Sequence, residues 1–459
     1  MCHHRGVGGT RAVIALLALA AVGLVACGEG KARTETMTPT RSRAQAPAPA
    51  HSAAGEPAWP TYGGSTSRSG VAQNAPSSPQ PRRRFEHSVD GQIYAQPLIA
   101  GGRIYVATEN NSVYAFTTDG RQVWRRHLGA PVPGGDLPCG NIDPSGITGT
   151  PAISHGRLFA VAFLAGGHRH ELFGLALDNG KIEVRTNVDP PNPLVEQERG
   201  ALLAAHGRVY VPYGGLFGDC GPFRGFVVST TERGKSRITY RNPATEAGIW
   251  APGGISAQAG TLLVSTGNGG GEGFGFQNSV IRLSPRLRRL ASWAPTEWAS
   301  LSSGDVDEGS LAPLPVDGGR VFQIGKDGIG NLLRPGLGGI GGEQFADRVC
   351  DGGAFGAAAF SAPLAILPCG DSLHALRIGG NRFDVAWRSD SGGLVPIVVG
   401  NSVFAITRDG TLDQLGLDDG HTIGSTQVGS GATSFPAPAA AGDTLAVPAG
   451  RKLVVFSLA

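Results

Sequence analysis

The sequence is poor in charge and especially in lysine. Charged residues make up 16% of its 459 residues, the formal net charge is +3, and lysine occurs at only five positions. No basic stripe with interleaved aromatic residues runs through the repeated part of the chain. Because a nucleic-acid-binding surface needs such a stripe to neutralise phosphates, we expect no nucleic-acid partner.

Three catalytic signatures are also absent. The chain has no Gly-x-Ser-x-Gly elbow, no His-Glu-x-x-His pair and no glycine-rich phosphate loop followed by a helix. These motifs place a serine nucleophile, a zinc ion and nucleotide phosphates, respectively. Hydrolase, zinc-protease and NTPase functions therefore have no support in the sequence.

Glycine and proline, in contrast, are abundant, with 72 and 32 residues. In the stretch 94–128, short runs that alternate with period two are separated by Gly-Gly, Glu-Asn-Asn and Thr-Asp-Gly turns. This pattern is typical of an antiparallel meander. The predicted strands cover residues 94–99, 103–108, 112–116 and 121–127.

Similar units follow at a spacing of roughly forty residues, which is typical of propeller blades. The units begin at Tyr94, Gly146, Arg199, Gly248, Gly309, Ala354, Leu394 and Phe435. The last unit has three strands, and Arg83–Val89 is a candidate for its fourth, which would leave no sheet edge open. We therefore predict an all-β fold, an eight-bladed β-propeller closed by its N- and C-terminal strands. If one weak unit is an insertion, the alternative is a seven-bladed propeller, and the fifth unit is the first candidate for such an insertion.

The repeat resembles that of a known family. Residues 94–124 fit the pattern of the pyrroloquinoline-quinone (PQQ) type repeat, and residues 59–70 (Trp-Pro-Thr-Tyr-Gly-Gly and onward) are similar to the lead-in peptide of such propellers. The resemblance covers residues 58–459. The repeat is shared by quinoprotein dehydrogenases and by non-catalytic lipoproteins, such as the scaffold lipoprotein of the bacterial outer-membrane assembly machine.

Residues 1–27 have the pattern of an export signal. A short positive region precedes an apolar stretch that is short for a membrane span, and the stretch ends in Leu-Val-Ala-Cys27. This ending resembles a bacterial lipobox, in which Cys27 is lipidated and becomes the mature N-terminus. An ordinary signal peptide with an incidental cysteine is the alternative.

Residues 28–57 lack apolar periodicity and are rich in Pro, Ala, Ser and Thr, so we interpret them as a disordered tether. Acyl chains on Cys27 would anchor the propeller, residues 58–459, to a membrane. We expect an exported monomer, bound to the outer surface of the cytoplasmic membrane or to a periplasm-facing leaflet. Its expected partner is a protein or an envelope polymer.

Four cysteines remain beyond Cys27, and an even number in an exported protein predicts disulfides. In a propeller, the turns between the second and third strands share a face with the connections between blades. Cys350 and Cys369 meet there in the sixth unit. Cys139 and Cys220 come to the same face from the first connection and the third unit. We therefore predict the pairs 350–369 and 139–220.

Six further residues are predicted on this face by the same argument. They are Asp219, Trp250, Asn268, Asp305, Asp307 and Lys326. Their positions resemble parts of the quinoprotein dehydrogenase site, and the resemblance implies PQQ and Ca²⁺ as candidate cofactors.

The resemblance also implies roles. Trp250 would stack under the quinone, and Asn268 and Asp219 would ligate Ca²⁺, which prefers oxygen ligands. Asp305 or Asp307 would act as the base that accepts the alcohol proton. Lys326 would pair with a quinone oxygen or with a carboxylate.

The sequence leaves two functions open. The first is a membrane-tethered lipoprotein whose propeller is a non-catalytic binding or scaffold module. It is favoured by the lipobox, the tether and the absence of the adjacent cysteine pair that the dehydrogenases carry over the quinone. The alternative is a PQQ- and Ca²⁺-dependent oxidoreductase, which requires the six residues to meet around one pocket. If they do not meet, the turn-forming tendency of Asn, Asp and Gly explains them instead.

Overall fold

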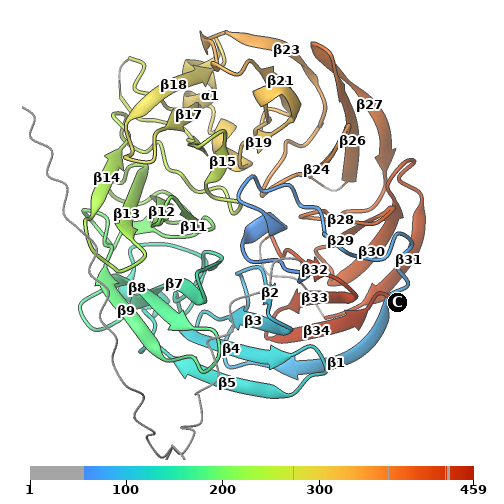
Figure 1. Cartoon of the computed structure of the whole chain (residues 1–459). Helices are drawn as coiled ribbons and strands as arrows, with labels where there is room; N and C mark the ends of the chain where they lie inside the picture. Colours follow the sequence, from blue (N-terminus) through green and yellow to red (C-terminus); the bar gives the residue numbers. More distant parts are fainter. Residues whose placement is uncertain (1–55, 272, 371, 430, 432–434) are drawn as a thin grey trace, which may run out of the picture. The chain divides into compact units, whose positions relative to one another are not determined.

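The computed structural model describes residues 56–459, except 272, 371, 430 and 432–434. Eight small antiparallel sheets, each built on four strands, stand around a central axis and form an eight-bladed β-propeller (Figure 1). This confirms the predicted fold. The seven-bladed alternative is wrong, because the fifth unit forms a four-stranded sheet of its own. The predicted signal, Cys27 and most of the predicted tether lie outside the described residues.

The blades follow one another in chain order. Blade 1 contains β2 (Leu98–Ala100), β3 (Arg103–Ala107), β4 (Ser112–Thr117) and β5 (Gln122–His127), and blade 2 contains β6 (Ala152–Ser154), β7 (Arg157–Leu164), β8 (Arg169–Ala176) and β9 (Ile182–Asn187). Blade 3 contains β11 (Leu203–Ala205), β12 (Arg208–Gly215), β13 (Phe226–Thr231) and β14 (Ile238–Arg241). Blade 4 contains β15 (Ser256–Gln258), β16 (Thr261–Ser265), β17 (Val280–Leu283) and β18 (Arg289–Ala294). Blade 5 contains β19 (Leu314–Pro315), β20 (Val321–Gln323), β21 (Ile329–Leu333) and β23 (Glu343–Arg348), and blade 6 contains β24 (Ala359–Ser361), β25 (Leu364–Cys369), β26 (Ser372–Gly379) and β27 (Arg382–Ser389). Blade 7 contains β28 (Ile397–Val399), β29 (Ser402–Ile406), β30 (Thr411–Gly416) and β31 (Thr422–Gln427). Blade 8 contains β32 (Ala439–Ala441), β33 (Thr444–Ala449), β34 (Lys452–Ser457) and β1 (Arg82–Ser88).

A few short elements lie outside this scheme. The strand β10 (Glu196–Gln197) pairs with β12, and β22 (Gly339–Ile340) pairs in parallel with β18. The helix α1 (Trp298–Ser303) and the 3-10 turns lie in connections. These turns are Tyr62–Gly64, Gly134–Asp136, Glu308–Ser310 and Asp317–Gly319. Within the described part of the chain, no helix has the length and apolar character needed to cross a membrane.

The ring closes as the sequence predicts. Strand β1 pairs antiparallel with β34, from Arg82 opposite Ser457 to Ser88 opposite Lys452. Figure 1 shows the blue N-terminal strand beside the red C-terminal one. The last blade therefore combines both ends of the repeated region, and its edge is paired instead of open.

The outermost strand of a blade packs on the next blade through the tryptophan of the repeat. Trp124 on β5 donates a hydrogen bond from Nε1 to the Leu177 carbonyl of blade 2 at 3.0 Å. A Cβ on Gly180 would lie 2.6 Å from its ring, so only glycine fits this contact. Trp387 of blade 6 bonds Leu417 of blade 7 in the same way, at 2.9 Å. A tryptophan on the outermost strand therefore fixes the contact between neighbouring blades in both places.

The first predicted strand is shorter than expected. It begins at Leu98 instead of Tyr94. Pro97 has no N–H for a ladder, and Gln96 is engaged elsewhere, since its backbone N–H donates to Thr150 Oγ1 at 2.8 Å. The Gln96 side chain accepts from Trp59 Nε1 at 2.9 Å, which ties blade 1 to the lead-in peptide.

The lead-in peptide, residues 59–70, crosses the inside of the ring, where Figure 1 shows it in blue. Its backbone bonds the innermost strands of blades 1, 2, 4, 6 and 7, each at 2.7 Å: Trp59 N to Ile99 O, Ile153 N to Pro60 O, Ala257 N to Thr66 O, Phe360 N to Ser69 O and Val398 N to Gly70 O. One short segment therefore connects five blades that are far apart in the sequence.

Arg68 anchors this peptide from its centre. The side chain is 2% exposed, and burial lowers the pKa of its guanidinium. Its nitrogens donate to Ile255 O at 3.0 Å, to Leu202 O at 2.8 Å, to Tyr62 O at 3.0 Å and to Thr61 Oγ1 at 2.5 Å. Four acceptors from the peptide and from blades 3 and 4 therefore compensate the desolvation of one charge.

Three buried glutamates lie among the inner connections. Glu109, Glu198 and Glu308 are 1%, 3% and 1% exposed, and each has at least one carboxylate oxygen without a hydrogen-bond partner among the described residues. Burial raises the pKa of Glu109 to about 7, against bonds from Gly146 N and Thr148 Oγ1. Burial also raises the pKa values of Glu198 and Glu308 well above their ordinary range.

We predict that Arg68→Met lowers the free energy of unfolding by about 3–5 kcal/mol, because it leaves several buried oxygens without donors. Chemical denaturation of the full chain measures this change. Arg286→Met, in the exposed β17–β18 turn, is the control and should stay within about 0.5 kcal/mol of the parent. A loss at Arg68 no larger than that of the control would show that the peptide does not depend on this side chain.

Glu109 predicts a pH dependence. Its pKa rises from 4.5 to about 7 on folding. The stability that the folded protein has with this carboxyl protonated is therefore fully present below pH 4.5, and it is lost as the pH rises through 7 and the buried carboxyl ionises. This shift corresponds to about 3 kcal/mol. Glu109→Gln should therefore be more stable than the parent at pH 8 and equal to it at pH 4.5, as measured by denaturation at both values. The exposed Glu183→Gln should show no such difference, and a Glu109→Gln gain at both pH values would contradict the titration.

Candidate functional site

The six residues predicted from the sequence line one cavity of about 630 Å³. They come from blades 3, 4 and 5: Asp219 from the β12–β13 loop, Trp250 from the connection before β15, Asn268 from the β16–β17 loop, Asp305 and Asp307 from the connection after α1, and Lys326 from the β20–β21 turn. Separate loops of three blades thus bring together residues that are more than a hundred positions apart. We call this cavity the site cavity.

Lys326 lies between two carboxylates. Its Nζ is 2.7 Å from Asp307 Oδ2 and 3.2 Å from Asp305 Oδ1. Burial alone would lower the pKa of Lys326, but the charge of Asp307 and the bonds to both aspartates outweigh it and raise the pKa. Lys326 is therefore a fixed positive charge. Asp307 is largely buried in this pair, whereas the Asp305 side chain is 78% exposed.

A hydrogen-bond network orients the acids. Asp307 Oδ1 accepts from the Asn268 N–H at 2.7 Å, and Asn268 Nδ2 donates to Asp305 Oδ1 at 2.9 Å. Asn278, which sequence reasoning missed, donates to Asn268 Oδ1 at 3.0 Å and accepts from Glu308 N at 2.8 Å. Asn278 is fully buried with φ of 46°. An asparagine between two strands was the only sequence signal for it, and that signal usually marks a turn.

Asp219 adds a third aspartate to the lining of the site cavity, which also contains Glu246. Desolvation raises its pKa, and the charges of Asp307 and Asp305 raise it further, against smaller effects of Lys326 and Arg199. The negative charge of this cavity therefore exceeds what its cations neutralise. A bound cation would relieve this imbalance.

A disulfide holds the loop that carries Asp219. Cys139 and Cys220 are paired, with Cα atoms 6.1 Å apart, and so join the blade 1–2 connection to the β12–β13 loop. Asn141 follows Cys139 and also lines the site cavity. Both of the pairs expected from the sequence are thus present in the structure.

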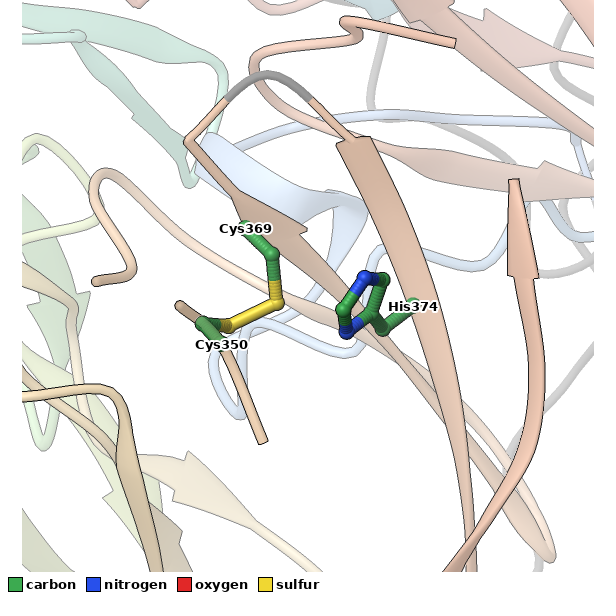
Figure 2. A group of neighbouring side chains, drawn as sticks. All are labelled: Cys350, Cys369 and His374. Carbon is green, nitrogen blue, oxygen red and sulfur yellow. A yellow bond between two sulfur atoms is a disulfide. The ribbon is translucent and has the colours of Figure 1, made fainter. Parts of the chain in front are cut away.

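The second pair, Cys350–Cys369, lies in blade 6 beside His374 (Figure 2). These three side chains have ligand atoms within 4.8 Å of one another, which is a spacing suited to a metal ion. However, both sulfurs are used in the disulfide, and the His374 nitrogens face Val349 O at 2.9 Å and Ser372 Oγ at 3.1 Å. The group is therefore a covalent link with a hydrogen-bonded histidine, and no thiolate is left for a metal.

Sequence reasoning also missed the apolar and cationic wall of the site cavity. Phe217, Phe355 and Phe435 line it, and Phe217 is 59% exposed. Arg199 lines it as well, with Cζ over the Trp250 ring at 5.4 Å from the centroid. Isolated aromatic and arginine residues in loops carry no pattern, so only the fold reveals that they meet.

The donor set fits a hard cation and a planar ligand. Asp219, Asp305, Asp307 and Asn268 offer oxygens, the ligand type that Ca²⁺ prefers, and Trp250 offers an aromatic face. The volume lies within the range of small-molecule sites. The acids are not assembled in advance around one point. The only group of three His, Cys, Asp or Glu ligand atoms within 4.8 Å in the described part of the chain is the one in blade 6.

Comparison with known sequences gives one family. Residues 78–213 match the family described as outer membrane protein assembly factor BamB. No curated protein matches the sequence. The matched residues include the first two blades and the start of the third, and they end before most of the site cavity residues.

Solved structures of similar fold include enzymes and a non-enzyme. The quinohemoprotein alcohol dehydrogenase from Comamonas testosteroni has a TM-score of 0.68 and 16% identity, covering 87% of this chain and 80% of its own. A europium-containing methanol dehydrogenase has a TM-score of 0.67 and 14% identity, covering 88% and 98%. BamB from Moraxella catarrhalis has a TM-score of 0.59 and 12% identity, covering 83% and 100%.

At these identities the likeness shows the fold, and it confirms the resemblance predicted from the repeat. By repeat and by fold, the chain is similar to the PQQ-repeat β-propellers, a group that contains both dehydrogenases and the assembly factor BamB.

Proposed function

We propose that this propeller is an oxidoreductase that binds PQQ and Ca²⁺ in the site cavity and oxidises an alcohol. The observation that carries the proposal is the meeting of six residues from three blades around one cavity. Turn chemistry accounts for Asn, Asp or Gly in each loop separately. It does not account for a tryptophan, three aspartates and a lysine that converge on a common space.

Some of the six residues would bind the cofactors, and others would take part in the reaction. Asp219 and Asn268 would provide oxygen ligands to the calcium ion, and Trp250 would provide the surface on which the quinone lies. When bound, the two cofactors would supply an electrophilic carbonyl that accepts the electrons of the substrate. Lys326 would supply a positive charge to the bound quinone, because Asp307 holds its ammonium in place.

Asp305 is the better-placed base of the two candidates. Asp307 uses both carboxylate oxygens, one with Asn268 N and the other with Lys326 Nζ. Asp305 uses only Oδ1, which both Asn268 and Lys326 contact, and its side chain is exposed to the cavity. One oxygen of Asp305 therefore stays available to accept the substrate hydroxyl proton.

A non-catalytic binding module is the second candidate, and one observation favours it. Lys326 already lies within ion-pair distance of both Asp305 and Asp307, so these carboxylates share a cation without a metal ion. In this alternative the propeller is a scaffold that binds an envelope protein or polymer. With the sequence-predicted lipid anchor at Cys27, either activity would take place at a membrane surface outside the cytoplasm.

We predict that Ca²⁺ and PQQ together stabilise the full chain against heat, whereas neither does so fully alone. At a hundred times its Kd, a ligand that binds only the folded state adds about 2.7 kcal/mol. A melting curve with each ligand, and with both, measures the effect. Asp219→Asn should weaken the calcium-dependent part, and Asp305→Asn should retain binding but abolish alcohol oxidation.

The matched control is Asp317→Asn, which changes an exposed aspartate in a turn outside the site cavity. It should behave as the parent in both assays. If the parent melts at the same temperature under all ligand conditions, the oxidoreductase proposal is wrong and the scaffold function becomes the working hypothesis. Crosslinking in the cell envelope would then identify the partner.

A further inference from the structure

The two disulfides differ in how far solvent can reach them. Cys350 and Cys369 are 0% and 3% exposed. Cys139 and Cys220 are half-buried, and the residues on both sides of each are exposed. A thiolate breaks a disulfide by attacking one of its sulfurs directly, so access to the sulfur limits the reaction. A reductant therefore reaches the Cys139–Cys220 pair first.

The accessible disulfide joins two loop tips that have little else to hold them. The tips are residues 138–142 of the blade 1–2 connection and residues 217–222 of the β12–β13 loop. In the described part of the chain, residues 138–142 make no hydrogen bond. The one hydrogen bond of residues 217–222 stays within their own loop, from Asp219 N to Leu216 O at 3.0 Å. Cys139 and Cys220, with Cα atoms 6.1 Å apart, therefore provide the bond between the tips.

The buried disulfide, in contrast, has support from the backbone around it. Cys350 N donates to Gly328 O at 3.1 Å, and Cys369 ends strand β25, where it pairs with Ser372 of β26. Both cysteines also belong to a hydrophobic cluster of blades 5 and 6. These contacts would keep the two segments in place without the S–S bond, so the chain contains a built-in comparison for the accessible pair.

Both loop tips contribute to the site cavity. Asn141 lies two residues beyond Cys139, Asp219 lies next to Cys220, and both residues line the cavity together with Phe217. A tip that is free to move has to be ordered again before it can contact a ligand, and this ordering costs conformational entropy. The state of the accessible disulfide therefore bears directly on ligand binding.

We propose that the Cys139–Cys220 disulfide is a redox-sensitive switch of the site cavity. A protein dithiol or a small-molecule dithiol reduces it: the S–S bond breaks, the two sulfurs take up two electrons and two protons, and the reductant leaves as its own disulfide. The freed tips separate, and Asp219 loses its fixed position. Reoxidation closes the cavity again. The inference rests on the proposed function for the identity of the ligand, whereas the order of reduction and the release of the tips do not depend on it.

The first measurement is the order of reduction in the folded full chain. The protein is titrated with dithiothreitol without denaturant and alkylated with iodoacetamide, and each cysteine is quantified by peptide mass spectrometry. We expect half-labelling of Cys139 and Cys220 at a dithiothreitol concentration about 10-fold lower than that for Cys350 and Cys369. Labelling of the two pairs together, or of the buried pair first, would overturn the inference.

The second measurement is the release of the tips. Phe217 is 59% exposed in the β12–β13 loop, and chymotrypsin cleaves after aromatic residues. Selective reduction should accelerate cleavage after Phe217 about 10-fold and leave the rest of the propeller intact, because only the tip opens. An unchanged rate would show that the tips stay in place, and cleavage throughout the chain would show that the disulfide holds the whole fold. Either result contradicts the switch.

The third measurement links the switch to the ligand. Isothermal titration calorimetry with PQQ and Ca²⁺ compares the parent with a Cys139→Ser, Cys220→Ser variant, which avoids a reductant that would react with the quinone. We expect the affinity of this variant to be about 10-fold weaker. The matched control, Cys350→Ala with Cys369→Ala, should bind as the parent does.

The outcomes separate this inference from the proposed function. If PQQ and Ca²⁺ bind the parent and the serine variant equally well, the switch is wrong and the oxidoreductase proposal stands. If the parent binds neither, the oxidoreductase proposal fails, while selective reduction with cleavage after Phe217 still supports the switch.

Discussion

The buried guanidinium of Arg68 and the peptide around it are the constraint on which the ring depends. A propeller blade contacts only its two neighbours, so nothing in the repeat itself fixes blades that lie opposite each other. The lead-in peptide supplies that missing connection, because it bonds the innermost strands of five blades. Strand β1 then closes the circle at β34. The fold is thus fixed both at its centre and at its seam.

This arrangement leaves the loops of one face available for chemistry. The lead-in peptide bonds the innermost strands from inside the ring, and the site residues lie on the loops of blades 3 to 5. These loops contain a group that the fold does not satisfy on its own, the carboxylate of Asp219, whose pKa is raised by desolvation and by the charges of Asp307 and Asp305. Proteins keep such groups where function requires them, since selection for stability alone would remove them.

The sequence predicts the periodic part of this molecule well and the irregular part poorly. Blade number, ring closure and the convergence of Trp250, Asn268 and Lys326 follow from a repeat that specifies which loops share a face. The start of β2 at Leu98, Asn278 and Arg199 do not. Each depends on a contact between distant segments, such as Gln96 with the lead-in peptide, and no local pattern encodes a contact of that kind.

The same reasoning separates the two candidate functions. A scaffold needs an exposed surface, and it gains nothing from three aspartates in one cavity. A site for a cation uses these carboxylates, because their mutual repulsion is relieved once the complementary charge is bound. Lys326 is compatible with either function, since its single charge pairs with Asp307 and Asp305 in both. The group that discriminates between the functions is therefore Asp219, whose pKa is raised by desolvation and by the charges of Asp307 and Asp305.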